Sequence, residues 1–189
     1  MAEDMRDITD PKALRAMAHP LRWQLLEILS REGTATATQC AQETGESVAN
    51  CSYHLNLLAR YDYVEKAEGG QGREKPWRLV NQSQRFGAEG SSDEETRLAA
   101  QAASIAFLDY QFAMIKDRNL RSGSLPAEWQ AATGIDNTHD FMTPAEVEEI
   151  HREVRKLMDR FRDRRTDPAK RPEGARSVNL FFSTMVKPD

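Results

Sequence analysis

Small and hydrogen-bonding side chains recur at helical spacing between residues 47 and 61. With a rotation of about 100° per residue, one face of a helix there carries Ala49, Ser52, Tyr53, Asn56 and Arg60. Residues of these types can contact base edges in the major groove of DNA. They are equally common on an ordinary solvated helix face, so their types alone leave both interpretations open.

Two short helices joined by a tight turn would present this face. Residues 35–44 can form the first helix, with Thr36 as its N-cap, and Gly45 permits a sharp exit because it tolerates the left-handed conformation. Ser47 can cap a second helix that runs to about residue 61. On another side of that helix, Cys51, Leu55, Leu58 and Asp62 fall on one stripe, and its apolar members are predicted to pack inward.

A β-hairpin is predicted next. Residues 63–67 and 75–80 are β-prone, and Gly69, Gly70 and Gly72 lie between them. Arg73 and Lys75 follow the tip, where cations can contact backbone phosphate or the minor groove. Trp77 is expected to bury its ring against the helices. A hairpin without a partner is the alternative, but the preceding helix pair favours DNA contact. The order of helix, turn, helix and β-hairpin predicts a winged helix-turn-helix.

The N-terminal part of the chain resembles ArsR-type winged-helix repressors. The similarity lies in the runs HPLRWQLLEIL, SVANCSYHLNLLARYDYVEK and REKPWRLV, and it covers about the first 80 residues. It implies a bacterial-type repressor that binds a palindromic operator as a homodimer, with the second helix in the major groove and the wing on the flanking backbone. Carried over by position, the groove residues are Val48, Ala49, Ser52, Tyr53 and Asn56, and the wing residue is Arg73.

The resemblance also raises the question of His54 and of metals. His54 stands at a position that is usually His in that family, where a buried hydrogen-bonding role and a DNA contact both remain open. Metal-sensing members carry clustered ligands, whereas Cys40 is flanked by Gln and Ala, and Cys51 lies on the apolar stripe. Glu148 and His151 could share a helix face, but such a pair is more often a surface ion pair. We expect no metal and no cofactor.

Composition limits the remaining possibilities. The 189 residues are 39% apolar, enough for a core, and no run approaches the roughly 18 consecutive apolar residues of a membrane span. Two cysteines and the lack of a signal-like N-terminus favour a reducing cytoplasm. The net charge of −4 does not favour binding to phosphate, so the DNA hypothesis requires clustered cations. The candidates are Arg22, Arg60, Arg73, Lys75 and Arg78.

The segments before and after the DNA-binding module are simpler. Residues 1–9 are expected to be frayed; Asp10 and Pro11 open a helix to about residue 17, and a helix opened by His19 and Pro20 ends at Gly33. Its core stripe is Leu21, Leu25, Ile28 and Leu29. Trp23 would pack either at a subunit interface or against a later helix. Residues 81–93 are polar and predicted to be a linker.

A long helix is predicted from a cap at Asp93 to about residue 121. It has two apolar bands, one of Leu98, Ala102, Ile105, Phe112 and Ile115, the other of Ala99, Ala103, Ala106, Tyr110 and Ala113. Pairing between two protomers would cover both bands, and we favour it over burial within one subunit.

The C-terminal residues are predicted to add a helix and a strand. Thr143 caps an amphipathic helix whose arginines alternate with acidic residues, which favours a solvated face over a nucleic-acid surface. Residues 177–186 alternate as in a strand, and Phe141 and Met142 lie in the other short run that could pair with them. This α+β region would dimerise the protein and could hold a small-molecule effector in an apolar pocket.

The predicted fold is therefore mainly α with a small β-wing (α+β). It comprises a winged helix-turn-helix domain at residues 1–80, a linker at 81–93 and a dimerisation or effector region at 94–189. The expected function is a cytoplasmic, homodimeric regulator of transcription that binds double-stranded DNA and represses. A winged-helix protein-interaction module is the alternative. No paired carboxylates, nucleophile arrangement or phosphate-binding loop supports an enzyme, and no membrane partner is expected.

Overall fold

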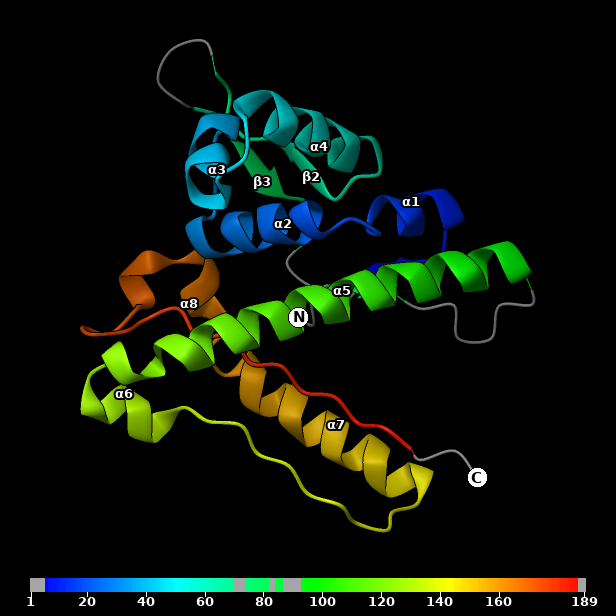
Figure 1. Cartoon of the computed structure of the whole chain (residues 1–189), viewed down its shortest axis with the longest axis vertical. Coiled ribbons are helices and arrows are strands. Elements are labelled where there is room, and N and C mark those ends of the chain that lie inside the picture. Colours follow the sequence, from blue (N-terminus) through cyan, green and yellow to red (C-terminus); the bar gives the residue numbers. More distant parts are fainter. Residues whose placement is uncertain (1–5, 70–73, 82–83, 87–92, 187–189) are drawn as a thin grey trace. The chain divides into compact units, whose positions relative to one another are not determined.

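The computed structural model describes residues 6–69, 74–81, 84–86 and 93–186. The chain divides into two compact units, Met1–Ile115 and Lys116–Asp189, which we describe separately. The first unit is helical apart from two small two-stranded sheets, and its first elements form a winged helix-turn-helix (Figure 1). The predicted fold class is confirmed.

Two capped helices start the first unit. Helix α1 (Pro11–Ala16) begins where the Asp10 carboxylate accepts a hydrogen bond from the backbone N–H of Lys12 at 3.0 Å. Helix α2 (Pro20–Glu32) begins where Nδ1 of His19 accepts from the backbone N–H of Leu21 at 3.2 Å. It ends at Gly33, whose φ of 77° lies in the region that favours glycine. All four residues of the predicted α2 stripe are buried.

The helix pair also agrees with its prediction. Helix α3 (Ala37–Thr44) begins with a capping box between Thr36 and Gln39 and ends at Gly45, which has a φ of 74°. Helix α4 (Val48–Arg60) follows, with the Ser47 hydroxyl accepting from the backbone N–H of Asn50 at 3.1 Å. The apolar members of the predicted α4 stripe are buried, whereas Asp62 has a φ of 57°, lies beyond α4 and is exposed.

The wing consists of β2 (Val64–Lys66) and β3 (Trp77–Leu79), which pair antiparallel. Trp77 is buried, as predicted, and its backbone exchanges hydrogen bonds of 2.8 and 3.1 Å with Ala35 in front of α3. This bridge attaches the wing to the start of the helix pair. The predicted turn glycines Gly70 and Gly72 lie outside the described residues.

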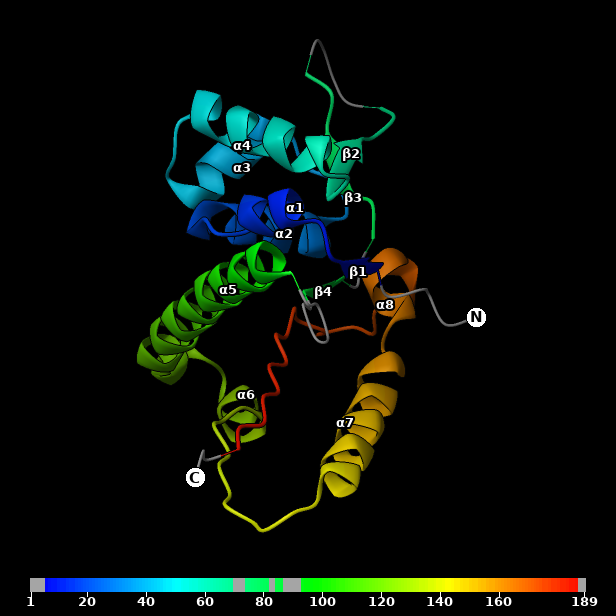
Figure 2. The same cartoon turned by 90° about the vertical axis from the view of Figure 1, so that its right-hand side faces the viewer.

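Helix α5 (Glu94–Arg121) starts at the predicted cap, where the Asp93 carboxylate accepts from the backbone N–H of Thr96 at 2.9 Å. Ala99, Ala100 and Ala103 are buried in the core of the first unit. Figures 1 and 2 show α2 between this helix and the α3–α4 pair. One α5 band is therefore covered by the protein's own core, whereas the other remains exposed.

Two aromatic contacts fix α5 on α2. The rings of Trp23 and Phe107 lie 4.7 Å apart, and the hydroxyl of Tyr110 donates to the Glu27 carboxylate. Trp23 is only 7% exposed, and its Nε1 donates to the carbonyl oxygen of Met17 at 2.8 Å. Of the two alternatives for Trp23, packing against a later helix is therefore observed.

A second small sheet joins segments that the sequence indicated as loose. Strand β1 (Arg6–Ile8) pairs in parallel with β4 (Gln84–Phe86). The expectation of a frayed segment at residues 1–9 was wrong where β1 lies, and β4 lies within residues 81–93, where we expected a linker or loose loop. Ile8 is buried, and its burial explains why the N-terminal strand is held. The first compact unit also extends to Ile115, past the expected boundary.

The length and apolar composition of α5 bear on whether this helix could span a membrane. With the following turn, Glu94–Ser124 is long and apolar enough to cross a membrane by length and composition, with a hydropathy of 1.2 over its best window. Only 22% of that window is buried. Core helices of soluble proteins meet the same criterion, and the alanines of α5 pack in such a core. The criterion is therefore weak evidence for a membrane span.

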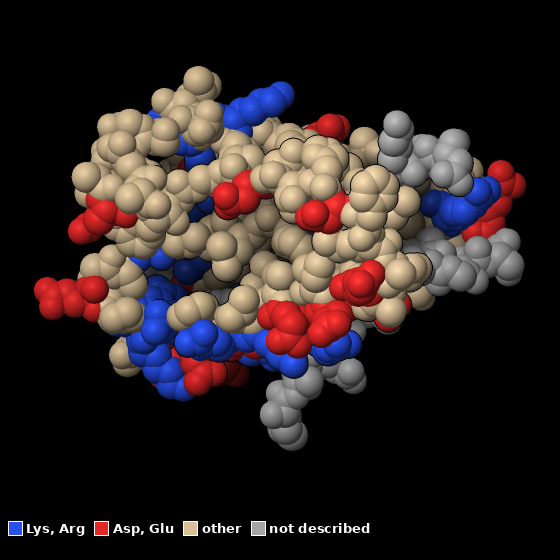
Figure 3. Space-filling view, turned by 90° about the horizontal axis from the view of Figure 1, so that it is seen from below, with Lys and Arg blue, Asp and Glu red and all other residues tan. Residues whose placement is uncertain are grey.

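The second unit is built from short helices and extended chain. After the end of α5 it contains η1 (Ser122–Ser124), α6 (Ala127–Ala132), α7 (Pro144–Asp159), α8 (Asp163–Thr166) and η2 (Pro168–Lys170). Ion pairs of Glu153 with Lys156 and of Asp159 with Arg162, both at 2.7 Å, support the interpretation of a solvated charged face. Basic and acidic side chains are also interspersed on the face shown in Figure 3.

The predicted C-terminal strand is not observed. Residues 177–186 form no strand, nor do Phe141 and Met142, and none of the described side chains of this unit is buried. Instead, His151 of α7 lies 2.8 Å from the Thr184 hydroxyl and 5.0 Å from the Phe182 ring. Alternating apolar residues form a strand only when another strand completes their backbone hydrogen bonds, and the described part of this unit provides none.

Candidate nucleic-acid interface

The exposed face of α4 contains the predicted groove residues. Val48 and Tyr53 are 46% and 62% exposed. Ala49, Asn56 and Arg60 are also exposed, whereas Ser52 is half-buried. The predicted residues therefore share the accessible side of one helix. Whether they contact DNA stays a prediction.

The Asn side chains of α4 donate hydrogen bonds to nearby groups of the same chain. The Asn56 Nδ2 group donates to the carbonyl oxygen of Ser52 at 2.7 Å and lies 3.4 Å from its hydroxyl oxygen. The Asn50 Nδ2 group donates to the Glu46 carboxylate at 2.9 Å. Asn56 therefore offers its amide oxygen, an acceptor, for a contact with a base amino group.

The opposite side of α4 is fixed by buried groups. Cys51, Leu55 and Leu58 are fully buried. His54 is 5% exposed, and its Nδ1 accepts a hydrogen bond from Nε of Arg22 at 3.1 Å. An Nδ1 acceptor requires a neutral ring with its proton on Nε2. The structure thus gives His54 the buried, hydrogen-bonding role that the sequence left open.

Burial, followed by the nearby His19 and Arg22, lowers the pKa of His54. The rings of His19 and His54 are 4.5 Å apart, so a second positive charge here would be repelled. Arg22 also donates to the carbonyl oxygen of Ala16, and desolvation by burial lowers the pKa of its guanidinium. Arg22 therefore links α1, α2 and α4 inside the unit instead of presenting its charge on the α4 surface.

The other candidate cations differ in their surroundings. Arg60 and Lys75 are exposed, whereas Arg78 pairs with Glu65 at 2.7 Å. Arg73 lies outside the described residues, so its predicted wing contact is untested. The described cations available for phosphate are therefore fewer than the five that the sequence suggested.

The base of the wing is anchored to α3 by Glu74, which the sequence analysis missed. Its carboxylate accepts from the backbone N–H of Thr38 at 3.1 Å and from the Thr38 hydroxyl at 2.8 Å. An anion in the first turn of a helix also interacts favourably with the helix dipole. On the other strand, Nζ of Lys66 lies 3.5 Å from the centre of the Trp77 ring, and burial lowers its pKa. No local sequence pattern predicts the contact between Glu74 and Thr38, because these residues are far apart in the chain and meet only in the folded protein.

Comparison with protein families supports this geometry. The model of a family described as a helix-turn-helix domain matches residues 17–66. Comparison with curated proteins gave no match. The family match includes α2, α3, α4 and β2, so the second wing strand and α5 lie outside it.

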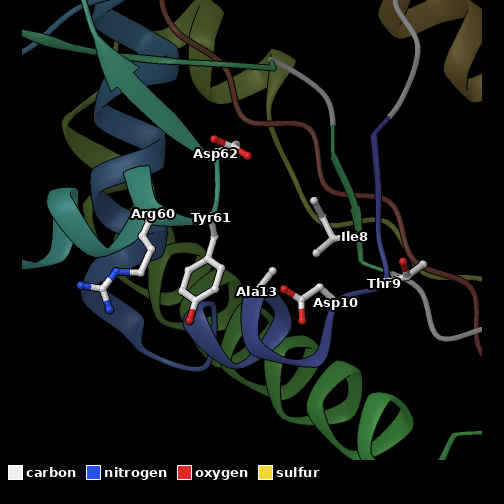
Figure 4. Close-up of a pocket in the computed structure, with 7 residues that line it drawn as sticks. All are labelled: Ile8, Thr9, Asp10, Ala13, Arg60, Tyr61 and Asp62. Atoms are coloured by element: carbon white, nitrogen blue, oxygen red, sulfur yellow. The ribbon is translucent and has the colours of Figure 1, made fainter.

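One shallow pocket adjoins the helix-turn-helix domain. It has a volume of about 250 Å³ and is lined by Ile8, Thr9, Asp10, Ala13, Arg60, Tyr61 and Asp62. Figure 4 shows the Arg60 side chain extending away from Asp10 and Ile8. The pocket is polar and belongs to the first unit, not to the region in which the sequence placed an effector. The predicted effector site is untested.

The cysteines of the helix-turn-helix domain are poor ligands. Cys40 and Cys51 are free thiols and fully buried. Burial raises the pKa of Cys40 to about 11, which keeps it protonated at neutral pH. Among the described residues, no three His, Cys, Asp or Glu side chains cluster at a distance that could hold a metal ion.

Proposed function

We propose that this protein is a transcription regulator that binds specific double-stranded DNA as a homodimer, as ArsR-type repressors do. The observation that carries the proposal is the exposed face of α4 on a matched helix-turn-helix domain. In such domains the second helix enters the major groove and its N-terminal residues contact base edges. We infer that Val48, Ala49, Ser52, Tyr53 and Asn56 make these contacts. The protein would act in the cytoplasm, repress, and carry out no catalysis.

The wing and the end of α4 would contact the DNA backbone. Lys75 and Arg60 are exposed, and Arg73 lies two residues before Lys75 in the chain. Two copies would double this small set of cations. Because the net charge is −4, we expect moderate affinity that falls as salt rises.

The homodimer is inferred from the exposed band of α5. Leu98, Ile105 and Phe112 are 54%, 52% and 51% exposed, and Leu108 is 36% exposed. Their spacings of seven, three and four residues are those of helix pairs. We call these four residues the α5 stripe. A second copy of the same helix would cover it, and a two-fold dimer matches a palindromic operator.

A winged-helix protein-interaction module is the second candidate. The acidic net charge and the internal use of Arg22 and Arg78 favour it, because both reduce attraction to phosphate. In that case the exposed face of α4 would bind another protein.

Selection of duplexes from a random DNA pool by the full chain tests the proposal. Enrichment of one sequence is expected, and Tyr53→Ala and Asn56→Ala should each weaken its binding by about 1–3 kcal/mol if one base contact is lost. Asn137, exposed in the second unit, provides the control variant Asn137→Ala, which should bind like the parent. A pool that stays random would favour the protein-interaction module. Unchanged selectivity in both α4 variants would contradict the assigned groove residues.

A further inference from the structure

We propose that the first turns of α4 recognise thymine, through contact of Val48 and Ala49 with its C5-methyl group. This inference rests on the proposed DNA-binding function and specifies what the exposed face of α4 recognises. It follows from three properties of that face: its charge, the state of its hydrogen-bond donors and its exposed apolar groups.

The first property is the lack of cations near the start of α4. The helix sequence is VANCSYHLNLLAR, so its single Lys or Arg is Arg60 at the last position. The common contact to guanine uses Arg or Lys on its O6 and N7 atoms. Because the N-terminal residues of the second helix lie nearest the bases, this contact is missing where α4 would approach most closely.

The second property is that each Asn amide of α4 already donates a hydrogen bond within the protein. A bidentate contact to adenine requires an amide that donates to N7 while accepting from N6. The Nδ2 groups of Asn50 and Asn56 instead donate to Glu46 and to Ser52 within the protein. Each of these bonds takes up one N–H of its amide and restrains the orientation of the side chain, so the remaining N–H could contact adenine only in the geometry that the existing bond allows.

The third property is apolar surface at the start of α4. Val48 is 46% exposed, and Ala49 beside it is exposed as well. The thymine methyl is the apolar group that base pairs present in the major groove, and small apolar side chains contact it. Burying Val48 and Ala49 against any other base edge would desolvate polar atoms without replacing their hydrogen bonds. Thymine is therefore the base that this surface fits.

Replacement of thymine by uracil tests the inference, because it removes the methyl group and leaves base pairing unchanged. The duplex selected by the full chain is resynthesised with single dT→dU changes, and each affinity is measured at fixed salt. A change at a contacted position should weaken binding about fourfold, the equivalent of one buried carbon group. At positions that the protein does not contact, affinity should be unchanged.

Protein variants separate a direct contact from an effect of the methyl on DNA shape. Val48→Ala and Ala49→Ser each reduce the apolar contact, and the first also favours helix formation. In at least one of them the dT-to-dU ratio at the sensitive position should fall toward one. Leu120→Ala, at an 86% exposed position of α5, serves as the control and should keep the parent's ratio.

The outcomes distinguish this inference from the function on which it depends. A specific duplex that tolerates every dT→dU change would overturn the inference and leave the proposed function standing. A ratio that persists unchanged in both α4 variants would also overturn it, because the methyl would then act without these side chains. Failure to enrich any duplex would overturn the proposed function and this inference together.

Discussion

Arg22→Ala should destabilise the first unit more than substitution of an exposed arginine on a helix would. Arg22 donates from Nε to Nδ1 of His54 at 3.1 Å and from a terminal nitrogen to the carbonyl oxygen of Ala16. Hydrogen bonds to a charged group contribute about 1.5–3 kcal/mol each, and a buried acceptor left without its donor costs about 1–3 kcal/mol. His54 is 5% exposed, whereas Arg22 is only half-buried. We therefore expect a loss of about 2–4 kcal/mol in the free energy of unfolding.

Urea unfolding followed by circular dichroism measures this loss. The matched control is Arg97→Ala, because Arg97 is 66% exposed and its nearest approach to Glu94 is 3.9 Å. Such a surface pair contributes at most about 0.5–1 kcal/mol. Arg22→Lys should give an intermediate loss, since one ammonium group cannot reproduce both donors of the guanidinium. If Arg22→Ala costs no more than Arg97→Ala, the proposed link between α2 and α4 does not stabilise the fold.

Three further perturbations address other parts of the molecule. Because the fold lowers the pKa of His54, the unfolded chain takes up a proton near pH 6.5 that the folded chain does not. The free energy of unfolding should therefore decline as pH falls below about 6.5, and His54→Gln should reduce this decline in urea melts; equal slopes would refute the role of His54. Glu74→Ala removes two hydrogen bonds to Thr38 and should cost about 0.5–1 kcal/mol while weakening DNA binding; unchanged binding would show that the wing base needs no anchor. Ile105→Glu places a charge on the α5 stripe and should convert a dimer into a folded monomer in sedimentation; a dimer of unchanged mass would move the interface elsewhere.

Local chemistry explains why the helix-turn-helix could be predicted from sequence. Thr36 and Ser47 are caps whose partners lie three residues away, and Gly45 occupies the one position between the helices where φ is positive. These choices depend on neighbours in the chain, so one sequence suffices to find them. The inward residues of α4 follow from the same helical period. Asp62 departs from it because the helix ends two residues earlier.

Contacts between distant segments could not be predicted in this way. Trp23 had two equally reasonable partners, and only the fold shows Phe107 against its ring. The pairing of β1 with β4 joins two short runs that lie far apart in the chain and has no signature in either run. Residues 177–186 show the converse error, since their alternation is that of a strand but no described segment of the second unit pairs with them.

The hydrogen bonds made by residues at the candidate interface could not be predicted from the sequence either. The residue types on α4 indicated a face able to bind bases, and exposure of Tyr53 agrees with it. The sequence did not show that Asn56 donates to the turn before it or that Arg22 donates into the interior. Both facts change which groups remain for DNA, and neither follows from helical spacing.

The burial of Trp23 beneath α5 has a practical consequence for dissecting the protein. The family match ends at residue 66, and the second wing strand ends at Leu79, so a fragment limited to the winged helix-turn-helix would end near residue 80. Such a piece would lose Phe107, which contacts the Trp23 indole, and the core residues Ala99, Ala100 and Ala103. The apolar surface left exposed to solvent would favour self-association. A shortened version ending at Ile115 keeps that cover. The smallest fragment that folds with a covered core is therefore set by α5, and not by the limits of the winged helix-turn-helix itself.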